Sequence, residues 1–251
     1  MNQRYFIKLS FKGTNYHGWQ IQKNALSVQE KLDDAVSKVL GCPVHTQGCG
    51  RTDAGAHATE FYAQFDYHGI TGEGKFLSAL NSSLPADIRV HDILPVIPEG
   101  HVRFHALSRT YEYIIIQKPD PLRNHSALYI YAPLDLDLLN DAAVILMQYD
   151  DFGSFCKFHS QASHHKCKIE SAGWHRNGQD IIFRITANRF LHGMVRAIIG
   201  TSLNLNKNKI TLDGFRKIIE SCDRRKAGES VPAKGLFLTR ILYPENIFLK
   251  F

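Results

Sequence analysis

Residues 48–58 hold the densest group of side chains that could do chemistry: Gly-Cys-Gly-Arg-Thr-Asp-Ala-Gly-Ala-His-Ala. The three glycines allow a tight turn, or the close approach of a ligand to the backbone. Arg51 and Asp53 are two residues apart, so in an extended chain their side chains share one face. A nearby positive charge keeps a carboxyl group ionised. An ionised, positioned carboxylate can act as a nucleophile or stabilise a cationic transition state.

The same residue types have a structural interpretation, which stays open at this point. An Asp in a Gly-rich segment commonly closes a turn by accepting hydrogen bonds from local backbone N–H groups. On residue types alone this is the commoner role for a residue such as Asp53, so the segment by itself does not establish catalysis.

Arg196 lies in an otherwise apolar helical pattern. Burying an unpaired charge is very costly, so a buried arginine needs a partner, and a carboxylate such as Asp53 would supply one in bidentate geometry. The alternative is an arginine at the helix surface whose aliphatic stem covers the core.

Basic side chains interleaved with aromatic ones recur along the chain, which favours a nucleic-acid partner. We expect most to be ordinary solvated charges and a subset to contact phosphates. The candidates are Lys12, Arg103, Arg109, Lys157, His159, His164, His165, Lys166, Lys168, Arg189, Arg224, Arg225 and Lys226.

Within this set, His159, His164 and His165 together with Cys167 could bind zinc. No second ligand pair has the spacing expected of a zinc site, so we expect no metal. A metal-binding regulatory protein remains an alternative hypothesis.

The first part of the chain predicts the element order β-α-β-β-α-β. The helix after Ser27 has a capping-box pattern with Glu30, and Gly41 is placed to end it. The expected strands are 5–11, 44–48, 59–67 and 88–96, and the expected helices are 28–40 and 73–82.

Pro95, Pro98 and Gly100 indicate a domain boundary. Beyond it, Asn177-Gly178 predicts a hairpin turn. We expect residues 152–167 to form a long loop. The expected strands are 109–117, 168–175, 180–187 and 236–243, and the expected helices are 134–147, 190–205 and 212–221.

These elements predict an α+β fold of two related domains, whose mostly antiparallel sheets meet to form a basic central cleft. The first domain, 1–103, carries the Asp53 loop, and the second, 104–251, completes the cleft.

The net charge of +6 over 251 residues fits a polyanionic partner. Five cysteines without a CxxC pair, no signal-peptide pattern and no apolar run of about 20 residues lead us to expect a cytoplasmic protein that does not span a membrane.

The segment 48–58 resembles the Arg-Thr-Asp-Ala-Gly-Val-His-Ala motif of the tRNA pseudouridine synthase A family. Further motifs of that family follow in family order over nearly the whole chain. They are residues 11–20, 27–32, 81–90 (Asn-x-x-Leu-Pro-x-Asp-Ile-x-Val), 109–113, 190–196 and 235–238.

The resemblance implies a role for each matching site residue. Asp53 corresponds to the catalytic aspartate, and Arg51 to the residue that helps flip the target nucleotide and holds its backbone. Tyr111 corresponds to the aromatic that stacks on the uracil. Arg196 corresponds to the arginine that pairs with the catalytic carboxylate, and Leu236 to an apolar residue of the base pocket.

The resemblance also implies substrate contacts for Gln20 and His57. The chain departs from the family pattern at three places. Ala56 replaces the commoner valine, and Thr110 and Glu112 stand where basic residues are frequent. Glu112 weakens the positive field there, which puts its contact with RNA in doubt.

The resemblance implies isomerisation of uridine to pseudouridine in the anticodon stem-loop of tRNA by a homodimer. The reaction releases no atoms and changes no redox state, so we expect no cofactor. The alternative from another class is a non-catalytic RNA-binding protein.

Overall fold

The computed structural model describes residues 2–158 and 163–249, so His159 of the proposed zinc group lies outside the described residues. The chain packs into two compact units. The first comprises Met1–Leu107 and Leu238–Phe251, and the second comprises Ser108–Phe237. The predicted division into domains 1–103 and 104–251 stays a prediction.

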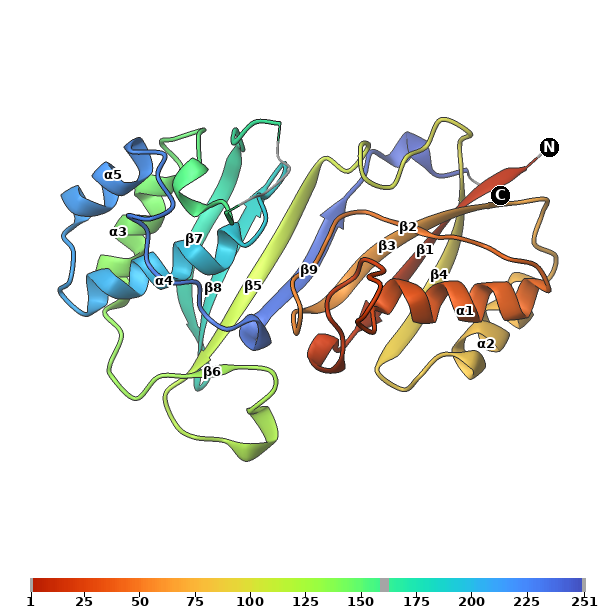
Figure 1. The fold of residues 1–251 in the computed structure, drawn as a ribbon, viewed down its shortest axis with the longest axis horizontal. Helices are drawn as coiled ribbons and strands as arrows, with labels where there is room; N and C mark the ends of the chain where they lie inside the picture. Colours follow the sequence, from red (N-terminus) through yellow and green to blue (C-terminus); the bar gives the residue numbers. More distant parts are fainter. Residues whose placement is uncertain (1, 159–162, 250–251) are drawn as a thin grey trace. The chain divides into compact units, whose positions relative to one another are not determined.

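The first unit is built on antiparallel strands (Figure 1). Strand β1 lies between β3 and β4, and β3 also neighbours β2 and β9. Tyr5, Phe6 and Ile7 of β1 are all buried, which places this strand in the core of the unit. The strand bounds are β1 Gln3–Phe11, β2 Gln47–Gly48, β3 His57–Tyr67, β4 Ile88–Val96 and β9 Leu236–Leu242.

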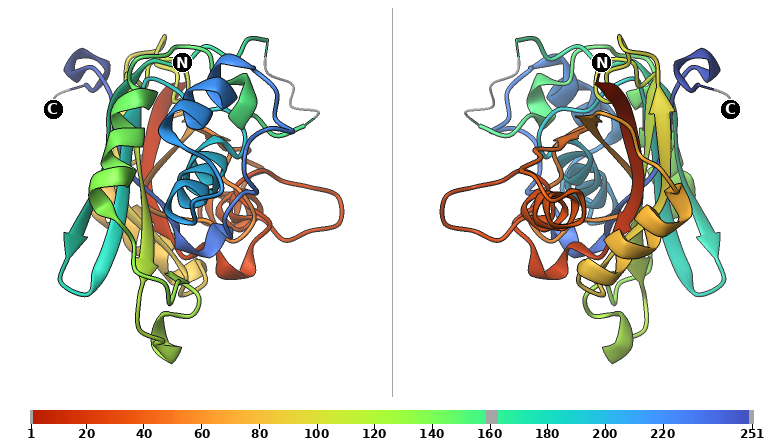
Figure 2. Two further views of the ribbon diagram at one scale, coloured as in Figure 1. Left: turned by 90° about the vertical axis from the view of Figure 1, so that its left-hand side faces the viewer. Right: turned by 90° about the vertical axis from the view of Figure 1, so that its right-hand side faces the viewer.

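Helix α1, Val28–Leu40, has the ends that the sequence predicts. The Ser27 hydroxyl accepts a hydrogen bond from the Glu30 N–H at 3.2 Å, an N-cap that satisfies one otherwise unpaired donor. Gly41 has a φ of 71°, the left-handed conformation that ends a helix at little cost to glycine. Helix α1 packs against α2, Glu73–Ser83, which in turn packs against β4. The segment between 3₁₀ helix η1, Gly13–Asn15, and α1 stands out from the strands in Figure 2.

The second unit holds a β-hairpin and three packed helices. Strand β8 lies antiparallel between β5 and β7, and the predicted turn has Gly178 at a φ of 58°. Helix α3 packs on β7, and α3, α4 and α5 contact one another. The bounds are β5 Ser108–Ile116, β6 Leu128–Tyr129, α3 Leu136–Leu146, β7 Ile169–Asn177, β8 Asp180–Ala187, α4 Met194–Asn206 and α5 Leu212–Glu220.

The described residues confirm the α+β class, with five α-helices and a mostly antiparallel strand arrangement. The predicted helix 190–205 was wrong at its start, because α4 begins only at Met194. Gly193 precedes it with a φ of 72°, so the chain turns there and the four preceding residues remain outside the helix. The predicted strand 44–48 is reduced to Gln47–Gly48, and the parallel strand β6 was not predicted.

Among the described residues, the structure contains no helix with the length and apolar character needed to cross a membrane.

Candidate active site

Asp53 lies at the start of a β-turn. The Ala56 N–H donates to the Asp53 carbonyl at 3.1 Å, and Gly55 has a φ of 80°. Glycine at the third position with a positive φ is typical of a type II turn. The side chain of Asp53 is half-buried, whereas Arg51 is exposed. The backbone of Asp53 therefore closes the turn, so the structural role and a chemical role for its carboxylate are compatible.

Two glycines of the opening loop bring a second backbone segment against this turn. A Cβ atom added to Gly13 would lie 1.8 Å from the Ala56 carbonyl oxygen. One added to Gly18, whose φ is 86°, would lie 2.2 Å from the Thr52 carbonyl oxygen. Only glycine permits such close approaches, so these two positions fix the backbone on both sides of Asp53.

His57 joins the opening loop to the start of β3. Its Nδ1 accepts a hydrogen bond from the Gly13 N–H at 3.1 Å, and the residue is only 2% exposed. Because Nδ1 accepts, the proton of the neutral ring resides on Nε2. The imidazole holds the loop against the turn, and its predicted contact with substrate stays a prediction.

The motif at residues 81–90 supports the same loop from the other side. The Tyr16 hydroxyl donates to an Asp87 carboxylate oxygen at 2.6 Å, and the Lys12 N–H donates to the Asp87 carbonyl at 2.8 Å. Burial, with a further contribution from Asp87, raises the pKa of Tyr16, which therefore stays protonated as a donor. The Tyr16 carbonyl accepts from the Gly55 N–H at 3.1 Å. Asp87 thus acts on the Asp53 turn through Tyr16.

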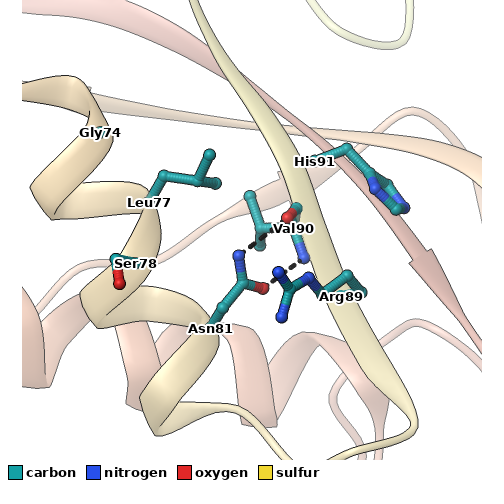
Figure 3. A pocket seen from close by; sticks show the side chains of 7 residues that line it. All are labelled: Gly74, Leu77, Ser78, Asn81, Arg89, Val90 and His91. Atoms are coloured by element: carbon teal, nitrogen blue, oxygen red, sulfur yellow. Dashed lines mark hydrogen bonds between the residues drawn. The ribbon is translucent and has the colours of Figure 1, made fainter.

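Asn81, the first residue of that motif, ties α2 to the edge strand β4 (Figure 3). Its side-chain amide donates to the Val90 carbonyl and its oxygen accepts from the Val90 N–H, both at 2.9 Å. A hollow of about 290 Å³ lies between α2 and β4 beside this contact, lined partly by Arg89 and His91. It contains none of the predicted site residues.

Trp19 and Gln20 lie where the opening loop meets α1. The Trp19 ring stacks on Phe61 with centroids 4.3 Å apart, and a Cβ on Gly48 would meet its indole nitrogen at 2.3 Å. Gln20 is exposed, and its Nε2 donates to the Gln29 side chain at 3.0 Å. Its predicted contact with substrate stays a prediction.

In the second unit, Tyr111 of β5 lies against Phe190. The two ring centroids are 5.0 Å apart and the planes are nearly perpendicular, at 88°. Such edge-to-face packing orients a ring. Helix α4 begins only at Met194, so Phe190 lies outside the helix and packs against Tyr111.

The two departures from the family pattern on β5 have partners on β8. Arg184 lies opposite Glu112 in the strand register and donates to its carboxylate from Nε at 2.7 Å. The hydroxyl groups of Thr110 and Thr186 are 2.9 Å apart. Glu112 is therefore paired with Arg184 across the two strands, and the expected weakening of the RNA contact at Glu112 stays a prediction.

Arg196 is half-buried on the first turn of α4. Its Nε donates to the Val231 carbonyl at 2.6 Å, and the Val231 N–H donates back to the Arg196 carbonyl at 3.2 Å. The close approach depends on Gly200, where a Cβ would lie 1.8 Å from the Glu229 carbonyl oxygen. These contacts fix the orientation of the guanidinium along the segment that follows α5.

Pro232, the residue after Val231, fixes β5 through its backbone carbonyl. The Tyr113 hydroxyl donates to the Pro232 carbonyl at 2.8 Å. Burial raises the pKa of Tyr113, while the charge of Arg196 lowers it. Leu236 follows this segment as the first residue of β9 and is 5% exposed. Its predicted place in a base pocket stays a prediction.

The proposed zinc group finds no support in the part of the chain that is described. No three His, Cys, Asp or Glu side chains among residues 2–158 and 163–249 are placed to hold a metal ion. His164 instead lies 2.8 Å from the Arg189 guanidinium. Burial raises the pKa of the Cys167 thiol to about 11, which disfavours the thiolate that binds metals.

Comparison with known proteins identifies the family. Residues 142–244 match the family described as tRNA pseudouridine synthase. A protein named tRNA pseudouridine synthase A from Parabacteroides distasonis is 46% identical over 98% of this chain and 98% of its own length. Proteins of the same name from Bacteroides thetaiotaomicron and a Nostoc species are 45% and 35% identical, over 98% of this chain and 93% and 88% of their own lengths.

The chain belongs to the tRNA pseudouridine synthase A family. Full-length similarity at this level gives the chain the family's activity, the isomerisation of uridine in tRNA. The predicted family and enzyme class are therefore confirmed.

Sequence reasoning missed several residues that position the side chains of the candidate site. Asp87 and Phe190 lay inside motifs that were recognised, but no role was given to either. Val231 and Pro232 lay in no recognised motif. The only signal for that segment was the group of Gly228, Pro232 and Gly235, which indicates an irregular chain.

Proposed function

We propose that this tRNA pseudouridine synthase modifies uridine in the anticodon stem-loop and that Asp53 is its catalytic carboxylate. The observation that supports the role of Asp53 is the way its turn is held. Gly13 and Gly18 press against the backbone on both sides, and His57 ties the loop to β3. Such preorganisation is what a group needs if it must meet a reacting atom in one geometry.

The reaction breaks the N1–C1′ glycosidic bond, turns the uracil and forms a C5–C1′ bond. The sugar carbon becomes electron-poor as the first bond breaks, and the Asp53 carboxylate supplies the anionic partner. It does so either by bonding to that carbon or by taking a proton from the sugar. The C5 proton leaves when the new bond forms, and N1, freed from the sugar, takes up a proton, so the nucleotide keeps its overall composition.

The target base must first leave the stack, which costs a few kcal/mol. In our proposal Arg51 occupies the vacated space and holds the RNA backbone, and Tyr111 stacks on the flipped uracil. Arg196 pairs with the carboxylate, and Leu236 lines the base pocket. The edge-to-face contact of Tyr111 with Phe190 and the Nε–Val231 contact of Arg196 support these roles, because each orients the side chain in advance.

Gln20 and His57 complete the proposed substrate contacts.

We further propose that the sheets of the two domains meet in a basic central cleft. The net charge of +6 and the family resemblance support this proposal. The same resemblance supports a homodimer. A solution mass near twice 28.5 kDa is expected, and a monomer mass at working concentration would contradict it.

Replacing Asp53 with Asn separates this proposal from a non-catalytic RNA-binding protein. The substitution keeps the shape and removes the charge, so we expect tRNA to bind about as well as to wild type while pseudouridine formation is lost. The matched control is Asp34→Asn, which removes an exposed carboxylate from α1 and should leave both properties unchanged.

The position on tRNA is tested with transcripts in which the anticodon stem-loop uridines are replaced by cytidines. We expect no pseudouridine in them. Product elsewhere in such transcripts would contradict the proposed target, and wild-type rates with Asp53→Asn would contradict the proposed carboxylate.

A further inference from the structure

Phe104 belongs to the segment between β4 and β5, which is drawn in yellow in Figure 1. Phe104 is 74% exposed, whereas most aromatic side chains of the first unit, such as Phe6, Trp19 and Phe61, are buried. A lone exposed apolar side chain is common on protein surfaces. Phe104 differs from such a side chain because its backbone is held in place and His101 and Arg103 lie beside its ring.

Hydrogen bonds from backbone N–H groups to two histidine rings and to one carbonyl hold the turn around Phe104 in one conformation. His101 Nδ1 accepts from the N–H groups of Arg103 and Phe104 at 3.1 and 3.3 Å, and the His105 N–H donates to the His101 carbonyl at 3.0 Å. His105 Nδ1 in turn accepts from the His101 N–H at 3.0 Å.

The base of the turn is tied to the sheet. The Val102 N–H donates to the Gln64 side-chain oxygen at 2.6 Å, and the Tyr243 hydroxyl donates to the Val102 carbonyl. The Arg4 guanidinium donates to the Gly100 carbonyl at 2.9 Å. The backbone that carries Phe104 is therefore ordered before any partner binds, which lowers the entropic cost of binding.

An imidazole ring and a guanidinium group lie beside the Phe104 ring. The His101 ring lies 4.2 Å from the Phe104 ring, centroid to centroid, with 36° between the planes. The Arg103 guanidinium lies over the ring at 5.8 Å from its centroid. Burial, followed by the charge of Arg4, lowers the pKa of His101, so its Nδ1 remains an acceptor at neutral pH.

We propose that Phe104 is a stacking platform for an unpaired nucleobase of the tRNA substrate, with Arg103 beside it to meet the RNA backbone. Exposed aromatic rings next to arginine are what proteins use to bind single-stranded or unpaired RNA bases. A protein partner would also accept an exposed phenylalanine, but the adjacent Arg103 guanidinium favours an anionic polymer. The proposal rests on tRNA as the substrate and not on the catalytic role of Asp53.

The test measures the affinity of the full-length enzyme for an unmodified tRNA transcript. Loss of one base–aromatic stack should weaken binding by about 5- to 150-fold in Phe104→Ala. Because the contact is made equally in the ground state and the transition state, the loss should appear in KM, with kcat close to wild type. The thermal midpoint should change little, because the side chain is exposed.

Three further variants make the result specific to the ring. Phe104→Tyr should bind like wild type because it keeps the aromatic face, and Phe104→Leu should bind as weakly as Phe104→Ala because it keeps only apolar bulk. Leu122→Ala removes another exposed apolar side chain, which is 92% exposed in the second unit, and should bind like wild type.

Wild-type affinity in Phe104→Ala or in Phe104→Leu would overturn the proposal, as would equal losses in Phe104→Ala and Leu122→Ala. The binding measurement does not require turnover. A wild-type enzyme that makes no pseudouridine but binds tRNA through Phe104 would therefore overturn the proposed function and leave this inference standing.

Discussion

Backbone groups orient the side chains expected at the site. The Val231 carbonyl receives Arg196 Nε, and the Gly13 N–H reaches His57 Nδ1. Backbone atoms in a packed segment move little, so these contacts fix the direction of a side chain more firmly than another flexible side chain would. At the residue scale, small changes in side-chain geometry should therefore affect activity even when charge is conserved.

Arg196→Lys tests this directly. Lysine keeps the positive charge but loses Nε and the planar fork, so it cannot donate to Val231 and face a carboxylate together. We expect kcat/KM to fall roughly 10- to 150-fold, the value of one hydrogen bond to a charged group. Arg184→Lys is the control, because its pair with Glu112 is more exposed and should contribute little. Equal losses in the two variants would contradict the role of Arg196.

Asp33, on the buried face of α1, carries a pH dependence of stability. Burial raises the pKa of its carboxyl group above the ordinary 3.8, although Thr46 donates to Oδ1 from its N–H and its hydroxyl. Oδ2 makes no hydrogen bond among the described residues, and His45 Nδ1 lies 3.5 Å away. Between the ordinary and the raised pKa, the folded protein holds a proton that the unfolded chain has released. The contribution of Asp33 to stability therefore falls as pH rises through that window.

Asp33→Asn should accordingly be more stable than wild type at pH 7, because it avoids burying a charge and can still accept from Thr46. The difference in thermal midpoint should shrink as pH falls towards 4. Asp34→Asn, on the exposed face of the same helix, should show no such trend. An Asp33→Asn variant that is less stable than wild type at pH 7 would show that the carboxylate is stabilising.

At the scale of elements, the Asp53 turn depends on a loop that comes from elsewhere in the chain. Gly18→Ala would place a Cβ 2.2 Å from the Thr52 carbonyl oxygen at a φ of 86°. We expect about 1–3 kcal/mol of lost stability from strain and overpacking, and reduced kcat because the turn must shift.

Gly50→Ala is the matched control, since a Cβ at Gly50 meets nothing within 4 Å. Thermal unfolding of the two variants compares them directly. Similar midpoints for Gly18→Ala and wild type would show that the loop does not constrain the turn.

The sequence predicted helices and strands well where the residues that start and end them lie close together in the chain. The ends of α1 follow from Ser27 and Gly41, and β4 has the predicted bounds, 88–96. The start of α4 was missed because it depends on the distant packing of Phe190 against Tyr111, which overrides a continuous helical pattern. The support of the Asp53 turn by Asp87 through Tyr16 was missed for the same reason, since the residues are far apart in the chain.

At the scale of the whole molecule, net charge governs the approach to RNA. With a net charge of +6, binding of tRNA should release counterions. Each phosphate that is neutralised on a duplex adds about −0.9 to the slope of log affinity against log salt concentration. We expect a slope that corresponds to several phosphates, measured by titration from about 50 to 200 mM salt. A slope near zero would contradict an electrostatic RNA interface.

Pseudouridine mapping tests the central claim most directly. Purified protein is incubated with unmodified tRNA transcripts, without added metal or nucleotide, beside Asp53→Ala. The account predicts pseudouridine in the anticodon stem-loop with wild type and none with the variant, at comparable tRNA binding. Pseudouridine at wild-type levels with Asp53→Ala, or tRNA binding without product in the wild type, would contradict it.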